Sequence, residues 1–273
     1  MTEWMEWAPL VLTMVGTGVL AGVMAGLLGV GGGIVIVPVL DTALGALAVD
    51  PAIRMHIAVA TSLATIVLTS LSSARAHHRR GAVDFQLARS WGPLIFCGAV
   101  FGAWLASRLH GNVLALVFGG VAILLGLRML LFGGRNPAPG RELSPGGLAR
   151  LFPLGIGGLS SMMGIGGGTF SVPVLTLLGH SIHRAVGTSA LFGLLISLPG
   201  ALAYVATGWG DDRLPAGSLG FVSLPGLACI APMTVLAAPL GARLAHRLSA
   251  RQLNFAFGVF LVLVASRMLY RAL

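Results

Sequence analysis

Two glycine-rich runs hold the residues best suited to chemistry in this chain. Gly29–Gly33 is followed by Pro38, and Gly164–Gly168 is followed by Pro173. Both runs interrupt apolar sequence, where three consecutive glycines destabilise a continuous helix. A helix that restarts after such a break leaves unpaired N–H groups and the positive end of its dipole in the break, and these bind anions. We therefore predict an anionic substrate bound by Gly31, Gly32, Gly33, Gly166, Gly167 and Gly168.

A Thr-Ser pair follows each glycine run and adds hydroxyl groups to the predicted site. The pairs are Thr61-Ser62 and Thr188-Ser189. Their hydroxyls can donate to an oxyanion, and we include all four residues among the substrate-binding candidates. In membrane helices such hydroxyls also bond the carbonyl four residues earlier or a neighbouring helix, so this second interpretation stays open.

Two histidines and two arginines lie just before these pairs and are candidates for gating or proton coupling. They are His56, His183, Arg54 and Arg184. A histidine there either takes up a proton or lies at the membrane interface, and we favour the interface. The arginines either attract anions or extend to the lipid headgroups, and we favour the headgroups.

Acidic and catalytic signatures are sparse. The carboxylates lie in termini and loops, and Asp41 is the one candidate for membrane depth. Since cation pathways usually carry buried acids, this distribution favours an anion as the cargo. The sequence has no nucleophile–base pair and no clustered His/Cys set, so we predict no catalytic residue, no metal and no cofactor.

Composition indicates a multi-pass membrane protein. Apolar residues make up 56% of the chain and charged residues 9%, whereas soluble domains carry about a quarter charged residues. The net charge of +9 comes from arginines at segment ends, which indicates loops beside membrane spans rather than a nucleic-acid footprint. The predicted partners are thus a lipid bilayer and a small anion, with no nucleic acid.

Ten apolar segments follow one another along the chain. The expected segments are 9–29, 33–47, 53–75, 87–107 and 112–132, then 147–164, 168–180, 185–207, 218–242 and 251–271. Segments 33–47 and 168–180 are shorter than the ~20 residues that a spanning helix needs. We predict that both are half-helices or re-entrant limbs.

The two sets of segments form an internal repeat. Gly22 and Gly157 lie 135 residues apart, Thr61 and Thr188 lie 127 apart, and Arg128 and Arg267 lie 139 apart. We predict one transmembrane domain over 1–273, with repeat one at about 9–132, a cytoplasmic linker at about 133–146 and repeat two at about 147–273. Gly18, Gly22 and Gly26, spaced four apart, are expected to let two helices pack closely.

Arginines in the loops predict that the repeats have opposite orientations. Arg75, Arg79 and Arg80 place the loop after the third segment in the cytoplasm, whereas the equivalent loop of repeat two carries Asp211 and Asp212. The fold class expected is therefore an all-α integral membrane protein with two inverted-topology repeats and broken or re-entrant half-helices. Transporters of this kind bind substrate near the midplane, between the repeats.

The motifs together resemble one family. The paired Gly-x-Gly-Gly-Gly runs with their prolines, and the sequence His-Arg-Ala-Val-Gly-Thr-Ser over His183–Ser189, are similar to those of the sulfite exporter TauE/SafE family, the TSUP permeases. This resemblance implies an inner-membrane transporter of sulfur oxyanions or organosulfonates in a bacterium or archaeon. Repeat one departs from the pattern at Ile57–Ala60 and in a longer loop over Asp41–Pro51, which argues against identical roles for the two halves.

The leading hypothesis is a secondary transporter, an exporter of a small sulfur-containing oxyanion or organosulfonate such as sulfite, with protons as the candidate coupling ion. A passive anion channel, a transporter of another small organic anion and a non-transporting scaffold are the alternatives. The sequence carries no signal for the oligomeric state.

Overall fold

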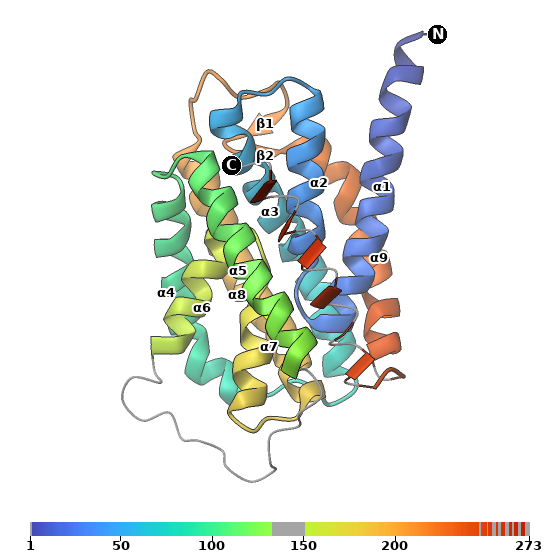
Figure 1. The fold of residues 1–273 in the computed structure, drawn as a ribbon, viewed down its shortest axis with the longest axis vertical. Coiled ribbons are helices and arrows are strands. Elements are labelled where there is room, and N and C mark those ends of the chain that lie inside the picture. The colour runs from blue at the N-terminus through green and yellow to red at the C-terminus, as the bar shows by residue number, and fades with distance from the viewer. Residues whose placement is uncertain are drawn as a thin grey trace.

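The computed structural model describes residues 2–132 and 151–245 and parts of 247–270, with side chains from Leu12 onward. The chain is helical almost throughout (Figure 1). Over residues 2–132 and 151–245 its helices are α1 (Thr2–Leu28), α2 (Gly33–Ala46), α3 (Pro51–His78), α4 (Phe85–Ala106), α5 (Gly111–Phe132), α6 (Leu151–Met162), α7 (Gly168–Leu177), α8 (Ile182–Thr207) and α9 (Leu224–Ala245). The predicted linker at 133–146 lies outside the described residues.

Local sequence explains where the longer helices begin. The Asp50 carboxylate accepts from Ala52 N at 2.9 Å beside Pro51, the first residue of α3. Asp84 caps α4 in the same way through Leu87 N at 3.0 Å, and Ser181 caps α8. These side chains satisfy N–H groups that a helix leaves unpaired at its start.

Helices α2 and α7 are half-helices, as their sequence predicts. They contain 14 and 10 residues, so at 1.5 Å per residue they extend about 21 Å and 15 Å, less than the ~30 Å hydrocarbon core. Each forms a hairpin with the helix before it. After the glycine-rich turn that precedes it, α2 runs toward the end of the molecule at which the N-terminus lies. Helix α7 runs from its own glycine-rich turn toward the opposite end (Figure 1).

Small residues bring helices of the two halves into close contact. A Cβ built on Gly22 of α1 would lie 2.6 Å from the Thr234 carbonyl of α9, so only glycine fits there. Gly157 of α6 would overlap the Ile95 carbonyl of α4 in the same way. The predicted close packing of Gly18, Gly22 and Gly26 is thus confirmed, and the partner of each first helix belongs to the other half.

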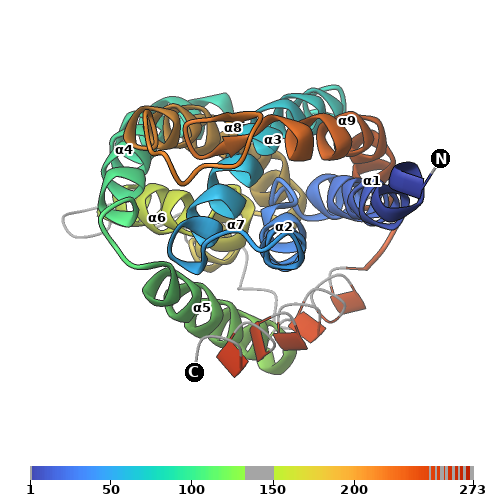
Figure 2. The same ribbon diagram turned by 90° about the horizontal axis from the view of Figure 1, so that it is seen from above.

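The helices form two rows with α5 outside them (Figure 2). One row contains α4, α8, α3 and α9, and the other contains α6, α7, α2 and α1. Helices α3 and α8 pack against each other at the centre. Each half-helix packs on the long helix that follows it.

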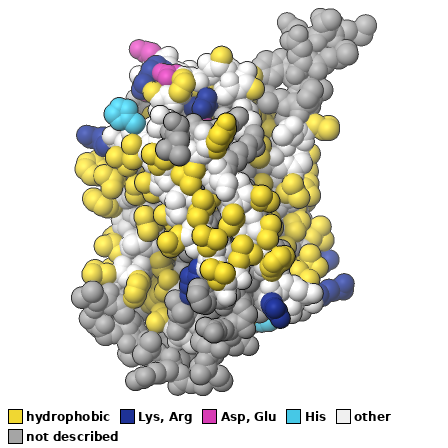
Figure 3. Space-filling model, in the orientation of Figure 1, with side chains coloured by type: hydrophobic (Ala, Val, Ile, Leu, Met, Phe, Trp, Pro, Cys, Tyr) yellow, Lys and Arg dark blue, Asp and Glu magenta, His cyan; other side chains and the backbone are white. Residues whose placement is uncertain are grey.

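The surface is that of a membrane protein. On the face drawn in Figure 3, hydrophobic side chains cover the middle and charged side chains gather toward the two ends. Among the described helices, four are long and apolar enough to cross a membrane: α3, α5, α8 and α9. The predicted class, an all-α multi-pass membrane protein, is confirmed.

Several predicted boundaries are wrong, and two of the differences have a local explanation. The segment expected to span from residue 218 starts instead with a short hairpin of β1 (Ser218–Leu219) and β2 (Val222–Ser223), and α9 begins only at Leu224. Gly217 and Gly220 take positive φ angles of 81° and 52°, which reverse the chain where hydropathy alone indicates helix. Helix α8 begins at Ile182 rather than 185 because Ser181 caps it.

Candidate functional site

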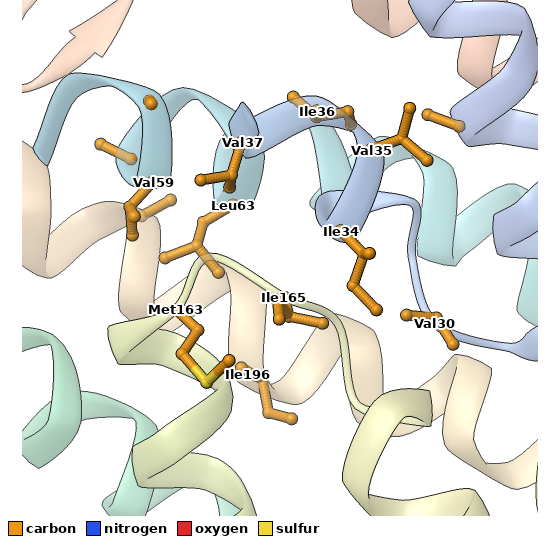
Figure 4. Close-up of a cluster of buried hydrophobic side chains, with 14 of the residues drawn as sticks. Val30, Ile34, Val35, Ile36, Val37, Val59, Leu63, Met163, Ile165 and Ile196 are labelled. Atoms are coloured by element: carbon orange, nitrogen blue, oxygen red, sulfur yellow. The ribbon is translucent and has the colours of Figure 1, made fainter. Parts of the chain in front are cut away.

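The two glycine-rich turns contact each other in the middle of the molecule. A Cβ built on Gly31 would lie 3.3 Å from Gly166 Cα, and one built on Gly168 would lie 2.7 Å from Val30 N. Side chains would therefore separate the two backbones. Apolar residues surround the crossing, including Val30, Ile34 and Ile165 (Figure 4).

Both half-helices start at this crossing without a cap. The N-cap residues are Gly32, with φ of 83°, and Gly167, and neither start has a side-chain cap. Within the described part of the chain, no group accepts from the N–H groups of residues 30–34 or 166–170. All of these residues are buried. Unpaired N–H groups and the positive ends of two helix dipoles thus meet where water is scarce, which is an environment suited to an anion.

The threonines of the predicted site connect the two halves. Thr61 Oγ1 accepts from Ser223 N, just before α9, and Thr188 Oγ1 accepts from Asp84 N, just before α4; both distances are 2.9 Å. These two contacts occupy equivalent places in the repeats. The protein itself therefore supplies a hydrogen-bond partner for each threonine hydroxyl.

The neighbouring serines differ from each other. Ser62 Oγ donates to the Gly164 carbonyl at 2.7 Å and so holds α3 on the turn of the other half. Ser189 is fully buried, and its hydroxyl has no partner among the described residues. Of the four predicted hydroxyls, that of Ser189 is the one that lacks a protein partner. Substrate binding by the glycines and hydroxyls stays a prediction.

The two candidate histidines have different surroundings, and whether either lies at the membrane interface stays a prediction. His56 is buried, its Nε2 lies 3.2 Å from the Ala106 carbonyl, and its ring lies 5.3 Å from that of Phe221. The end of α4 and the residues after β1 cover it. His183 is exposed at the start of α8, where an interfacial histidine is expected.

Both arginines pair with carboxylates. Arg54 Nε lies 2.9 Å from Asp41 Oδ1, and one Arg184 terminal nitrogen lies 3.2 Å from Asp84 Oδ2. The first pair joins α2 to α3, and the second joins the start of α4 to α8. Asp41, the one acid expected at membrane depth, is therefore neutralised by a neighbour.

Sequence reasoning missed several buried hydroxyls. Six more, all at least nine-tenths buried, have no partner in the described structure: Ser70, Ser160, Thr169, Ser171, Ser197 and Tyr204. Ser70 and Ser197 are repeat counterparts at the same offset of 127 residues that relates the Thr-Ser pairs. Extending that alignment by two further turns of α3 and α8 would have found them.

Comparison with known proteins identifies the family. The model of the family "Sulfite exporter TauE/SafE" matches residues 14–268. The chain belongs to this family. It is a family of membrane transporters, not of enzymes, so the expected class of function is confirmed.

Relatives described as probable membrane transporter proteins occur in several bacteria. A "Probable membrane transporter protein" of Haemophilus influenzae is 36% identical, over 92% of this chain and 95% of its own length. In Bacillus subtilis, "Probable membrane transporter protein YdhB" is 28% identical over 70% of this chain and 78% of its own length. YunE from the same organism is 26% identical over 94% and 96%. No solved structure matches the chain.

Proposed function

We propose that the protein is a secondary transporter that exports a small sulfur-containing oxyanion or organosulfonate, such as sulfite, across the inner membrane. One observation carries this proposal: two buried, uncapped helix N-termini meet at the centre of the molecule. A pyramidal SO₃ group presents several oxygen acceptors, which suit N–H groups converging from both starts. The family description supports the same substrate class.

The fold supports alternating access between the two halves. The hairpins α1–α2 and α6–α7 reach the crossing from opposite ends, and each is packed on helices of the other half (Figures 1 and 2). We assign the end with Arg75, Arg79 and Arg80 to the cytoplasm and treat the halves as inverted repeats. Because the crossing is buried, a solute reaches it only when the helices above or below it separate.

Flux through purified protein tests the proposal. The wild type in proteoliposomes is expected to move radiolabelled sulfite or an alkylsulfonate down an imposed gradient, faster than empty vesicles. The double variant Gly32→Leu plus Gly167→Leu is expected to abolish this flux, because its side chains would fill both helix starts. Gly120→Leu is the control, since a Cβ on Gly120 meets nothing within 4 Å.

Two results would contradict the proposal. If the wild type moves none of these anions, the substrate assignment is wrong. If the double variant elutes as a folded species and transports normally, the glycine breaks are not the site.

A passive anion channel would use the same backbone groups. Flux that responds to a proton gradient, together with an absence of single-channel currents, would support a carrier over a channel. Comparing vesicles of the two protein orientations would establish the direction of transport.

A further inference from the structure

The two glycine-rich turns differ in what lies on top of them. Ile66 of α3 covers the turn of repeat one: a Cβ built on Gly31 would lie 2.6 Å from Ile66 Cγ2, and one on Gly33 would lie 2.9 Å from Ile66 Cδ1. Ile66 is fully buried. The start of α2 is thus packed against a branched apolar side chain.

The repeat counterpart of Ile66 is Gly193 of α8. A Cβ built on Gly193 would overlap Ser70 Oγ and would lie 3.7 Å from Gly167 N, at the start of α7. Gly193 therefore lets the Ser70 hydroxyl pack directly against the backbone of α8, next to the uncapped start of α7. Only a residue without a Cβ allows this approach.

The Ser70 hydroxyl is available for a ligand. Ser70 is 1% exposed, and its Oγ has no hydrogen-bond partner in the described residues. Buried hydroxyls are normally paired, since an unpaired one costs free energy. A hydroxyl and a helix N-terminus that lie on either side of one glycine provide neutral donors for a single anionic group.

The first residues of the half-helices show the same difference. Thr169, the second residue of α7, corresponds to Ile34 in α2, and Ser171 corresponds to Ile36. The second repeat thus has hydroxyls where the first has isoleucines.

Resting on the proposed function, we propose that the anionic headgroup binds at the start of α7 and not equally at both breaks, with Ser70 as a ligating residue and Gly193 as the position that lets the Ser70 hydroxyl lie next to this helix start. The start of α2, covered by Ile66, forms the apolar side of the site. The substrate then carries one oxyanion group, and the protein binds it asymmetrically despite its repeated sequence.

Matched serine variants test this asymmetry. Ser70→Ala is expected to raise the half-saturating concentration for sulfite or methanesulfonate about tenfold or more, because a hydrogen bond to a charged group is lost. Ser197→Ala, at the repeat counterpart, is expected to change it less than twofold. Without ligand, Ser70→Ala is expected to melt at the wild-type temperature or above, since it removes an unpaired buried hydroxyl.

Two further variants keep the test decisive. Gly193→Ala is expected to reproduce the loss seen in Ser70→Ala, and the two together are expected to be no worse than either alone. If Ser70→Ala does not yield folded protein, Ser70→Cys replaces it, because the thiol keeps a small side chain but donates weakly.

The outcomes separate the two proposals. A wild type that neither transports nor is thermally stabilised by these anions contradicts the proposed function. A wild type that transports while Ser70→Ala and Ser197→Ala lose affinity equally, or Ser197→Ala loses more, overturns the asymmetric site alone. If Ser70→Ala melts at a lower temperature than the wild type without ligand, the Ser70 hydroxyl has a structural role. That result also overturns the asymmetric site.

Discussion

The hydroxyl of Thr188 accepts a hydrogen bond from the backbone N–H of Asp84 at 2.9 Å, which joins the second turn of α8 to the start of α4. Thr61 makes the equivalent contact with Ser223 at the start of α9. In each half, a threonine hydroxyl therefore binds the residue that directly precedes a long helix of the other half. The two contacts occupy equivalent positions in the repeats, and both would have to break before the two halves could separate completely.

Removing either hydroxyl should destabilise the fold. Thr188→Val and Thr61→Val keep the side-chain volume but leave a backbone N–H without its acceptor, at a cost of about 1–3 kcal/mol. Chemical unfolding in detergent measures the effect. Thr207→Val is the control, because that exposed hydroxyl bonds only the Ala203 carbonyl in its own helix. Equal effects at 188 and 207 would contradict the assigned role.

Close packing of α1 on α9 should be sensitive to a single methyl group. A Cβ on Gly26 would overlap the Ala238 carbonyl, so Gly26→Ala must separate the helices, at about 1–3 kcal/mol. In the same helix, Gly16→Ala meets nothing within 4 Å and should be neutral or stabilising. Melting temperatures of the two variants test the difference. A Gly26→Ala protein as stable as the wild type would refute this contact.

The Asp84 carboxylate has two separable roles. It caps α4 through Leu87 N and pairs with Arg184, which is about half exposed. Asp84→Asn keeps a capping oxygen and should cost less than about 1 kcal/mol, similar to Arg184→Gln. Asp84→Ala loses both interactions and should cost about 1–2 kcal/mol. If Asp84→Asn destabilises the protein as much as Asp84→Ala, the ion pair and not the cap stabilises this end of α4.

The loop before β1 should weaken at acidic pH. A side-chain hydrogen bond from Arg213 holds the pKa of Asp211 below its ordinary value, and Arg213 lies 2.6 Å from it. Since the folded-state pKa is the lower one, this stabilisation is complete above the ordinary aspartate pKa and is lost as pH falls through the folded-state value. Melting curves between neutral and strongly acidic pH should show Asp211→Asn less stable than the wild type near neutrality. The two should converge in acid.

Asp212→Asn, which changes the adjacent charge, is the control for this pH series. A constant gap between the wild type and Asp211→Asn at every pH would show that the carboxylate charge does not matter.

Several features were predictable because they depend on neighbouring residues alone. Three consecutive glycines in apolar sequence end a helix wherever they occur, and 10 to 14 further residues are too few to span a bilayer, so α2 and α7 were predictable as half-helices. The four-residue spacing of Gly18, Gly22 and Gly26 puts them on one helix face. The hairpin over 218–223 was missed because hydropathy reports burial and not the backbone angles of Gly217 and Gly220.

Sequence by itself determined that this protein is a membrane helix bundle with a duplicated pair of glycine breaks, because hydropathy, segment length and repeat spacing are local properties. Tertiary structure alone decided which elements meet: α1 packs on α9, the His56 ring lies against that of Phe221, and the Ser70 hydroxyl packs against Gly193. These contacts join residues far apart in the chain. They follow from how two halves interlock and bury each other's small residues, which no single segment encodes.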